Sequence, residues 1–105
     1  MAFFALFYHV VDRFVERRTP FRESHLAHAQ NAAARGELVL AGALADPADT
    51  ALIVFRSDSP DTARRFAETD PYVLNGLVQC WEVRSWNVVV GTFANLSTAS
   101  SKGGA

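Results

Sequence analysis

The chain has 105 residues, enough for one hydrophobic core and too few for two independent domains. With 50% hydrophobic and 20% charged residues it is not an intrinsically disordered chain, and its net charge of -1 excludes a general attraction to nucleic acid or to an anionic membrane. The single cysteine, Cys80, leaves no internal disulfide, which fits a reducing, cytoplasmic compartment.

The first predicted element is a strand over residues 3–10. Apart from His9 the stretch is apolar or aromatic, which is typical of a central strand buried on both faces. It lacks the basic start and cleavage site of a secretory signal, and it is too short to span a bilayer. Alternation divides its side chains between two faces: Phe3, Ala5 and Phe7 on one, and Phe4, Leu6 and Tyr8 on the other.

The main helix is predicted to begin at Thr19-Pro20 and to run to about Arg35, after an irregular or helical lead-in over residues 12–18. Threonine can cap a helix and proline suits its first position, while Gly36 is a typical stop. Three apolar side chains at three- and four-residue spacing are predicted to form its apolar stripe: Leu26, Ala29 and Ala33.

Two short strands, over residues 38–42 and 51–56, follow the helix and are joined by a hairpin at residues 46–49. Ser59-Pro60-Asp61 repeats the cap-plus-proline start and predicts a second helix that ends at Asp70. The inward side chains of that helix are predicted to be Ala63, Phe66 and Ala67.

A last β region is predicted over residues 77–90, with a bend or bulge between Val83 and Trp86 where the alternation breaks. We expect the folded domain to span residues 1–94 and the Ser-, Thr-, Gly- and Ala-rich residues 95–105 to form a flexible tail. The resulting order is strand, helix, strand, strand, helix, strand. It predicts an α+β, ferredoxin-like βαββαβ fold whose antiparallel sheet carries both helices on one face.

The other face of that sheet has no predicted cover. Because the first strand is apolar on both faces, a monomer would expose a larger apolar surface than soluble monomers usually do. We therefore predict a homodimer that packs sheet face against sheet face. The alternative is that loops and the C-terminal segment cover this face.

Histidines and one arginine are the first candidates for chemistry. His25 and His28 share a helix face, but no cysteine pair, HExxH motif or acidic cluster supplies further metal ligands, so we expect no metal. The His25 imidazole can exchange a proton near neutral pH, and Arg22, three residues earlier, would form an anion-binding corner beside it. We interpret His9 as a polar residue at a strand edge.

Asp70 is an unusual residue to end a helix, because the partial negative charge at a helix C-terminus favours Lys or Arg. Pro71 then blocks continuation of the helix. A broken local rule is typical of a functional position, although a solvated Asp-Pro turn is the simpler interpretation. In the ferredoxin-like plan the two helices lie side by side. Asp70 can therefore approach His25 of its own chain, or of a partner subunit, and orient its imidazole.

The stretches RESHLA, VLAGAL, FAETDPYV and WNVVVG occur in an order and spacing that resembles the YCII-related (YciI-like) family, over residues 3–91. The resemblance implies a ferredoxin-like protein of the dimeric α-β barrel type. The acid-base pair proposed for the family would fall here on His25 and Asp70. Further family positions, which we expect to bind substrate, fall on Arg22, Gly42 and Tyr72.

One branch of that family resembles dehydrochlorinases of chlorinated hydroxyquinols, which implies proton transfer on small aromatic or enol-like compounds. The sequence departs from the family pattern at Ala43, where a proline often follows the Ala-Gly pair, and in the short hairpin at residues 46–49. Both departures lie where a pocket mouth is expected, so the identity of the substrate does not carry over.

Three functional hypotheses follow. The first is a cofactor-independent enzyme with lyase, dehydrochlorinase or isomerase-like chemistry that uses His25 and Asp70. The second is a regulatory module that binds a small ligand without turning it over, and the third is a structural dimer whose site has decayed. No dinucleotide or phosphate-binding loop is present, so we expect no cofactor. Cys80 is predicted to be a buried, inert thiol on a strand.

Overall fold

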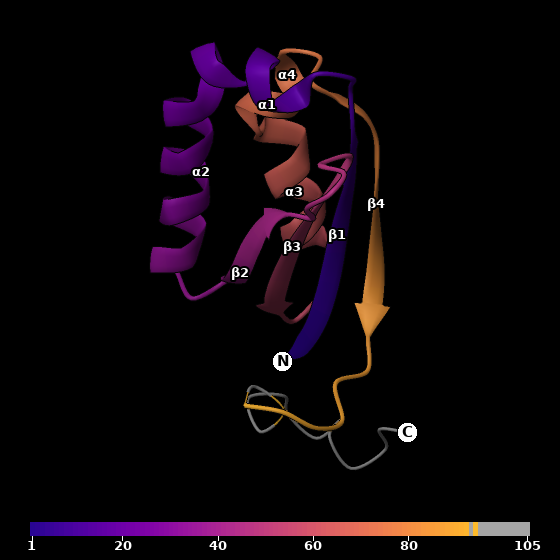
Figure 1. Cartoon of the computed structure of the whole chain (residues 1–105). Helices are drawn as coiled ribbons and strands as arrows, with labels where there is room; N and C mark the ends of the chain where they lie inside the picture. The colour runs from indigo at the N-terminus through magenta and orange to yellow at the C-terminus, as the bar shows by residue number, and fades with distance from the viewer. Residues whose placement is uncertain (93, 95–105) are drawn as a thin grey trace.

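The computed structural model describes residues 1–92 and 94, in which a sheet and a layer of helices pack together (Figure 1). The predicted tail over residues 95–105 lies outside the described residues, and the boundary at residue 94 stays a prediction. In chain order the elements are β1 (Ala2–Val10), α1 (Phe14–Arg17), the 3-10 helix η1 (Thr19–Phe21), α2 (Arg22–Ala34), β2 (Leu38–Ala43), β3 (Thr50–Ser57), α3 (Asp61–Thr69), α4 (Pro71–Leu74) and β4 (Val78–Trp86).

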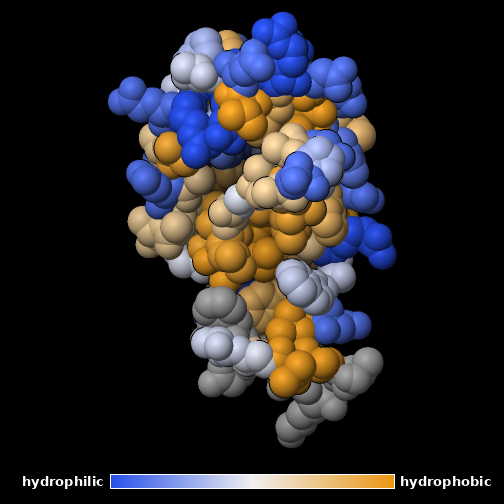
Figure 2. Space-filling model, viewed as in Figure 1, coloured by the Kyte–Doolittle hydropathy of each residue, from blue (hydrophilic) through white to orange (hydrophobic). Residues whose placement is uncertain are grey.

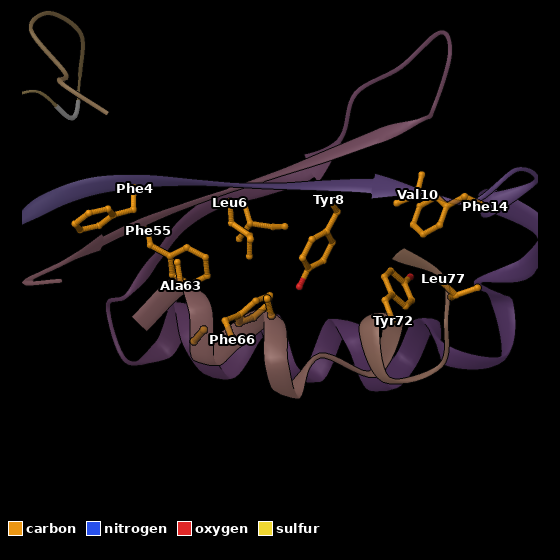
Figure 3. Close-up of a cluster of buried hydrophobic side chains, with 13 residues drawn as sticks. Phe4, Leu6, Tyr8, Val10, Phe14, Phe55, Ala63, Phe66, Tyr72 and Leu77 are labelled. Atoms are coloured by element: carbon orange, nitrogen blue, oxygen red, sulfur yellow. The ribbon is translucent and has the colours of Figure 1, made fainter. Parts of the chain in front are cut away.

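The four strands form one sheet in the order β2-β3-β1-β4, and every neighbouring pair is antiparallel. Figure 3 shows the sheet on one side of the core and the helices on the other. The predicted ferredoxin-like α+β fold is therefore confirmed. Both crossovers return the chain to the same side of the sheet, which leaves the opposite face without helices.

The core lies between the sheet and the helices. Alternate residues of the central strand β1 point into it, where they meet Phe55 of β3 and Phe66 of α3 (Figure 3). The intervening residues Phe3 and Ala5 are also buried, which confirms the prediction of a central strand buried on both faces. The residues that β1 contributes to the core are Phe4, Leu6, Tyr8 and Val10.

The predicted main helix is divided. Thr19 makes no capping hydrogen bond; it begins the 3-10 turn η1 instead, and α2 starts only at Arg22. Gly36 follows the helix with a φ of +79°, a backbone conformation that glycine adopts at little cost.

Of the predicted apolar stripe of the main helix, only Ala29 packs against the core; Leu26 and Ala33 remain exposed. Ala32 is the buried residue of α2. The three predicted residues line a cavity between α2 and the sheet, because the helix does not close down on β2 and β3 along that side: Leu26, Ala29 and Ala33.

Sequence reasoning missed the short helix α4. The second helix ends at Thr69, and Asp70 has an extended backbone that separates α3 from α4. The Asp70 carboxylate accepts a hydrogen bond from the backbone N–H of Tyr72 at 2.9 Å, so it caps the N-terminus of α4. Asp70 is therefore unfavourable as the residue that follows the C-terminus of α3 but favourable at the N-terminus of α4, where the partial charge is positive.

The last strand differs from its prediction in two ways. It ends at Trp86, which pairs with Phe3, rather than at Val90, because β1 extends only one residue beyond that pair. The pairing is regular between Val83 and Trp86, and the irregularity lies at Gln79, between the pairs that His9 and Val10 form with β4. A bulged residue is thus present at the start of the strand, not near its end.

The helix-free face of the sheet retains apolar surface. Leu40 on β2 and Trp86 on β4 are 57% and 47% exposed. Figure 2, in the view of Figure 1 that includes both helices and strands, shows hydrophobic side chains gathered in the middle of the molecule. Cys80 is on β4 as predicted, yet its thiol is exposed rather than buried, since its strand partner His9 also lies on this uncovered face.

Candidate acid-base site

The structure places His25 of α2 against Asp70, which lies between α3 and α4 of the same chain. The imidazole Nδ1 lies 2.9 Å and 3.0 Å from the two carboxylate oxygens of Asp70. The Asp70 side chain is 0% exposed, and that of His25 is 15% exposed. The carboxylate is thus shielded from solvent by the imidazole that it contacts.

Asp70 accepts two further hydrogen bonds in addition to that of His25. The hydroxyl of Tyr8 donates to Oδ2 at 2.8 Å, and the N–H of Tyr72 donates to Oδ1 at 2.9 Å. A buried carboxylate is stable only when such partners replace its hydration, and three donors from three segments meet this need. Sequence reasoning missed Tyr8 as part of the site. The available signal was the position of Tyr8 on a core face, where a phenol needs a polar partner.

Tyr8 keeps its proton over a wide pH range. Burial of the phenol raises its pKa far above the ordinary value, and the nearby Asp70 carboxylate raises it further through its charge and its hydrogen bond. The Tyr8 hydroxyl is therefore a permanent donor to Asp70. The carboxylate keeps this contact whatever the protonation state of His25.

The contacts of His25 define which imidazole nitrogen is available to a ligand. Since a carboxylate only accepts hydrogen bonds, Nδ1 carries the proton that faces Asp70, and Nε2 of the neutral ring has a free lone pair. Within the described residues, no hydrogen bond to Nε2 is found. The ring stacks on Tyr72 with centroids 3.8 Å apart and planes 6° apart, which holds its orientation.

A cavity of about 430 Å³ adjoins His25, between α2 and the strands β2 and β3. The predicted site residues Arg22, Gly42 and Tyr72 line it, while Asp70 lies behind His25 and Tyr72. A Cβ atom at Gly42 would meet no atom within 4 Å, so packing within one chain does not require glycine there. The lining residues are Tyr8, Phe14, Arg18, Arg22, His25, Leu26, Ala29, Gln30, Ala33, Leu38, Ala41, Gly42, Ala43, Ala51, Ile53 and Tyr72.

The other two histidines lie elsewhere. His28 Nε2 donates to the backbone carbonyl of Phe66 at 3.0 Å and its ring stacks on that side chain, so His28 ties α2 to α3 outside the cavity. His9 points to the helix-free face, 4.0 Å from Glu82. Over residues 1–92 and 94, no group of three or more His, Cys, Asp and Glu side chains has the arrangement of a metal site.

Comparisons with known proteins bear on the family and on the fold. A family model described as the YCII-related domain matches residues 1–87. No protein with a curated description matches significantly. In the described part of the chain, no helix has the length and apolarity needed to cross a membrane.

The solved structures that resemble the chain include the following two. One is 5-chloro-2-hydroxyhydroquinone dehydrochlorinase (TftG) from Burkholderia phenoliruptrix AC1100 in complex with 2,5-dihydroxybenzoquinone, with a TM-score of 0.67 and 18% identity over 80% of this chain and 92% of that chain. The other is protein Atu4242 from Agrobacterium tumefaciens, with a TM-score of 0.54 and 17% identity over 82% of this chain and 91% of that chain. At these identities the likeness shows a shared fold.

Proposed function

The chain belongs to the YCII-related family, and from that premise we propose that it is a cofactor-independent enzyme of small-molecule metabolism. His25 acts as the acid-base residue, Asp70 orients it, and Arg22, Gly42 and Tyr72 bind the substrate. The observation that carries the proposal is the bond between Nδ1 of His25 and Asp70, which leaves Nε2 as the proton acceptor. The resemblance to a dehydrochlorinase supports small aromatic or enol-like compounds as substrates.

In this proposal Nε2 of His25 removes a proton from the ligand, and the imidazolium that forms is stabilised by the buried Asp70 carboxylate. In an elimination, the electron pair of the broken bond to hydrogen moves into a new π bond, and chloride leaves with the electron pair of the C–Cl bond. In an isomerisation, the same nitrogen returns the proton to another atom. Arg22 stabilises the oxyanion that develops, a role in which a preorganised cation is worth most when water is excluded.

Proton transfer by one positioned imidazole contributes about 10²- to 10⁴-fold in rate. We therefore expect His25→Ala to lower turnover by that factor while the fold persists. His28→Ala is the matched control, because it removes the same ring from the same helix at a position outside the cavity.

The assay is chloride release from 5-chloro-2-hydroxyhydroquinone, together with deuterium exchange of ring C–H groups of 2,5-dihydroxybenzoquinone in heavy water. Equal rates for the wild type and His25→Ala in both measurements would remove the enzymatic proposal. A ligand that binds in the cavity and is recovered unaltered and unexchanged would instead establish the binding module.

We also propose a homodimer in which the helix-free sheet faces pack together. Leu40 and Trp86 supply exposed apolar side chains on this face, and both pair across the sheet with strands that present further apolar residues to the same side. Leu40→Glu is expected to convert the dimer to a monomer in sedimentation equilibrium. Leu74→Glu is the control, since Leu74 is 68% exposed but lies on α4. A wild type that sediments as a monomer at all concentrations would contradict the proposal.

A further inference from the structure

We propose that the ligand of this cavity is a small organic anion, with a carboxylate held between Arg18 and Arg22. The inference deepens the proposed function and rests on it for the place of the ligand. It adds a residue, Arg18, that neither the sequence pattern nor the comparisons single out, and it adds a charge requirement for the substrate.

The first observation is an imbalance of charge around the cavity. Its lining includes two guanidinium groups, of Arg18 and Arg22, and no carboxylate. Asp70, the acid behind the wall, is fully buried and already accepts three hydrogen bonds. The cavity is therefore a cationic place on a chain whose net charge is -1.

The second observation is that these two arginines have no acidic partner among the described residues. The arginines that form ion pairs there are Arg13, Arg35 and Arg64, all on the outer surface. Arg18 instead lies over the ring of Phe14, with its guanidinium carbon 5.4 Å from the ring centre, and Arg22 reaches the hydroxyl of Tyr72 at 3.5 Å. Apart from the bond of Arg22 to Tyr72, their hydrogen-bond donors are thus left for a ligand.

The third observation places both cations at the same end of the cavity as His25. Phe14, under Arg18, packs edge-on against Tyr72 at 5.4 Å, and Tyr72 stacks on the imidazole of His25. Arg22 contacts that same Tyr72. Tyr72 therefore links Arg22 to the imidazole directly and Arg18 through Phe14, and a bound anion would lie beside the reacting atom.

The rest of the lining is small and apolar. Leu26 and Ala29 of α2 face Ala41 and Ile53 of the sheet across the cavity. Such walls suit a flat hydrocarbon body, and a volume of about 430 Å³ is in the range of small-molecule sites. A ring or enol that carries one carboxylate satisfies both the apolar walls and the cationic end, because planar guanidinium groups match a carboxylate in a bidentate way.

The test uses two probes of equal shape, salicylate and the neutral salicylamide, in isothermal titration calorimetry. Salicylate is expected to bind at least about ten-fold more tightly. Arg18→Gln is expected to weaken salicylate about ten- to hundred-fold, the usual worth of a charge-assisted hydrogen bond, and to leave salicylamide within about two-fold. Arg17→Gln is the matched control, since it removes the same charge from an exposed neighbour that does not line the cavity.

Because Arg18 packs on Phe14, circular dichroism must show that its variant folds. Arg22→Gln, which changes an exposed side chain, provides the same test independently. Equal affinity for the two probes, an equal loss in Arg17→Gln, or no salicylate binding at millimolar concentration would overturn the inference. Inorganic phosphate that binds more tightly than salicylate would also overturn it, since it would identify a phosphate site.

The inference and the proposed function fail separately. If the two probes bind equally tightly but proton transfer depends on His25, the anion requirement alone is removed. Charge-selective binding without such proton transfer removes the enzymatic proposal and leaves a binding site for an anion.

Discussion

Tyr8→Phe is the substitution that best tests how Asp70 is held. It deletes one oxygen from a ring that otherwise keeps its place in the core, so it removes the 2.8 Å hydrogen bond to Oδ2 and little else. Both side chains are fully buried, so the carboxylate loses a donor that bulk solvent does not reach. The loss of a hydrogen bond to a carboxylate is worth about 1.5–3 kcal/mol in the free energy of unfolding. The melting temperature is expected to fall by roughly 5–20 °C.

The same variant has a distinct signature at alkaline pH. The phenol of Tyr8 has a raised pKa in the folded chain, whereas in the unfolded chain it ionises near pH 10. Above that pH the folded state binds one more proton, so the stability contributed by Tyr8 is complete below pH 10 and is lost as pH rises further. The slope of this loss is about 1.4 kcal/mol per pH unit. Tyr8→Phe should lack it.

The measurement is urea unfolding of the wild type, Tyr8→Phe and Tyr72→Phe between pH 7 and pH 12. Tyr72→Phe is the matched control, because among residues 1–92 and 94 its hydroxyl has only the 3.5 Å contact with Arg22, and we expect a change within about 0.5 kcal/mol. It also leaves Tyr8 as the single tyrosine, whose tyrosinate absorbance should appear only on unfolding. A similar small loss in both variants, or equal alkaline slopes, would refute the reasoning.

Three further outcomes are expected. Gly36→Ala destabilises the chain by about 1–2 kcal/mol in urea unfolding, because alanine is strained at the positive φ of this position. A Cβ atom there would meet no other atom within 4 Å, so no steric clash contributes. An unchanged urea midpoint would contradict this expectation. His28→Ala costs about 1 kcal/mol through the bond to Phe66 and leaves probe affinity unchanged in calorimetry; weaker binding would place His28 in the site. A thiol reagent should modify Cys80 faster in Leu40→Glu than in the wild type, and equal rates would argue against a covered sheet face.

The architecture could be predicted from the sequence because the patterns that indicate strands and helices are local. An apolar run buried on both faces, the proline-marked helix start at Ser59-Pro60 and the order of elements were enough to predict a ferredoxin-like sheet with β1 at its centre. Residue type and family resemblance also singled out His25 and Asp70, which lie 45 residues apart in the chain and meet in the fold.

Tertiary structure decided what surrounds that pair. Tyr8 and Asp70 are 62 residues apart, and their contact depends on how α3 and α4 pack under β1. The periodicity of apolar residues along the sequence does not predict this packing. Asp70 caps α4, a short helix that was not predicted from the sequence, and Leu26 faces a cavity rather than the core. Spacing along a helix determines which side chains share a face. Only the packing of elements distant in sequence determines whether that face meets a core, a cavity or another charge.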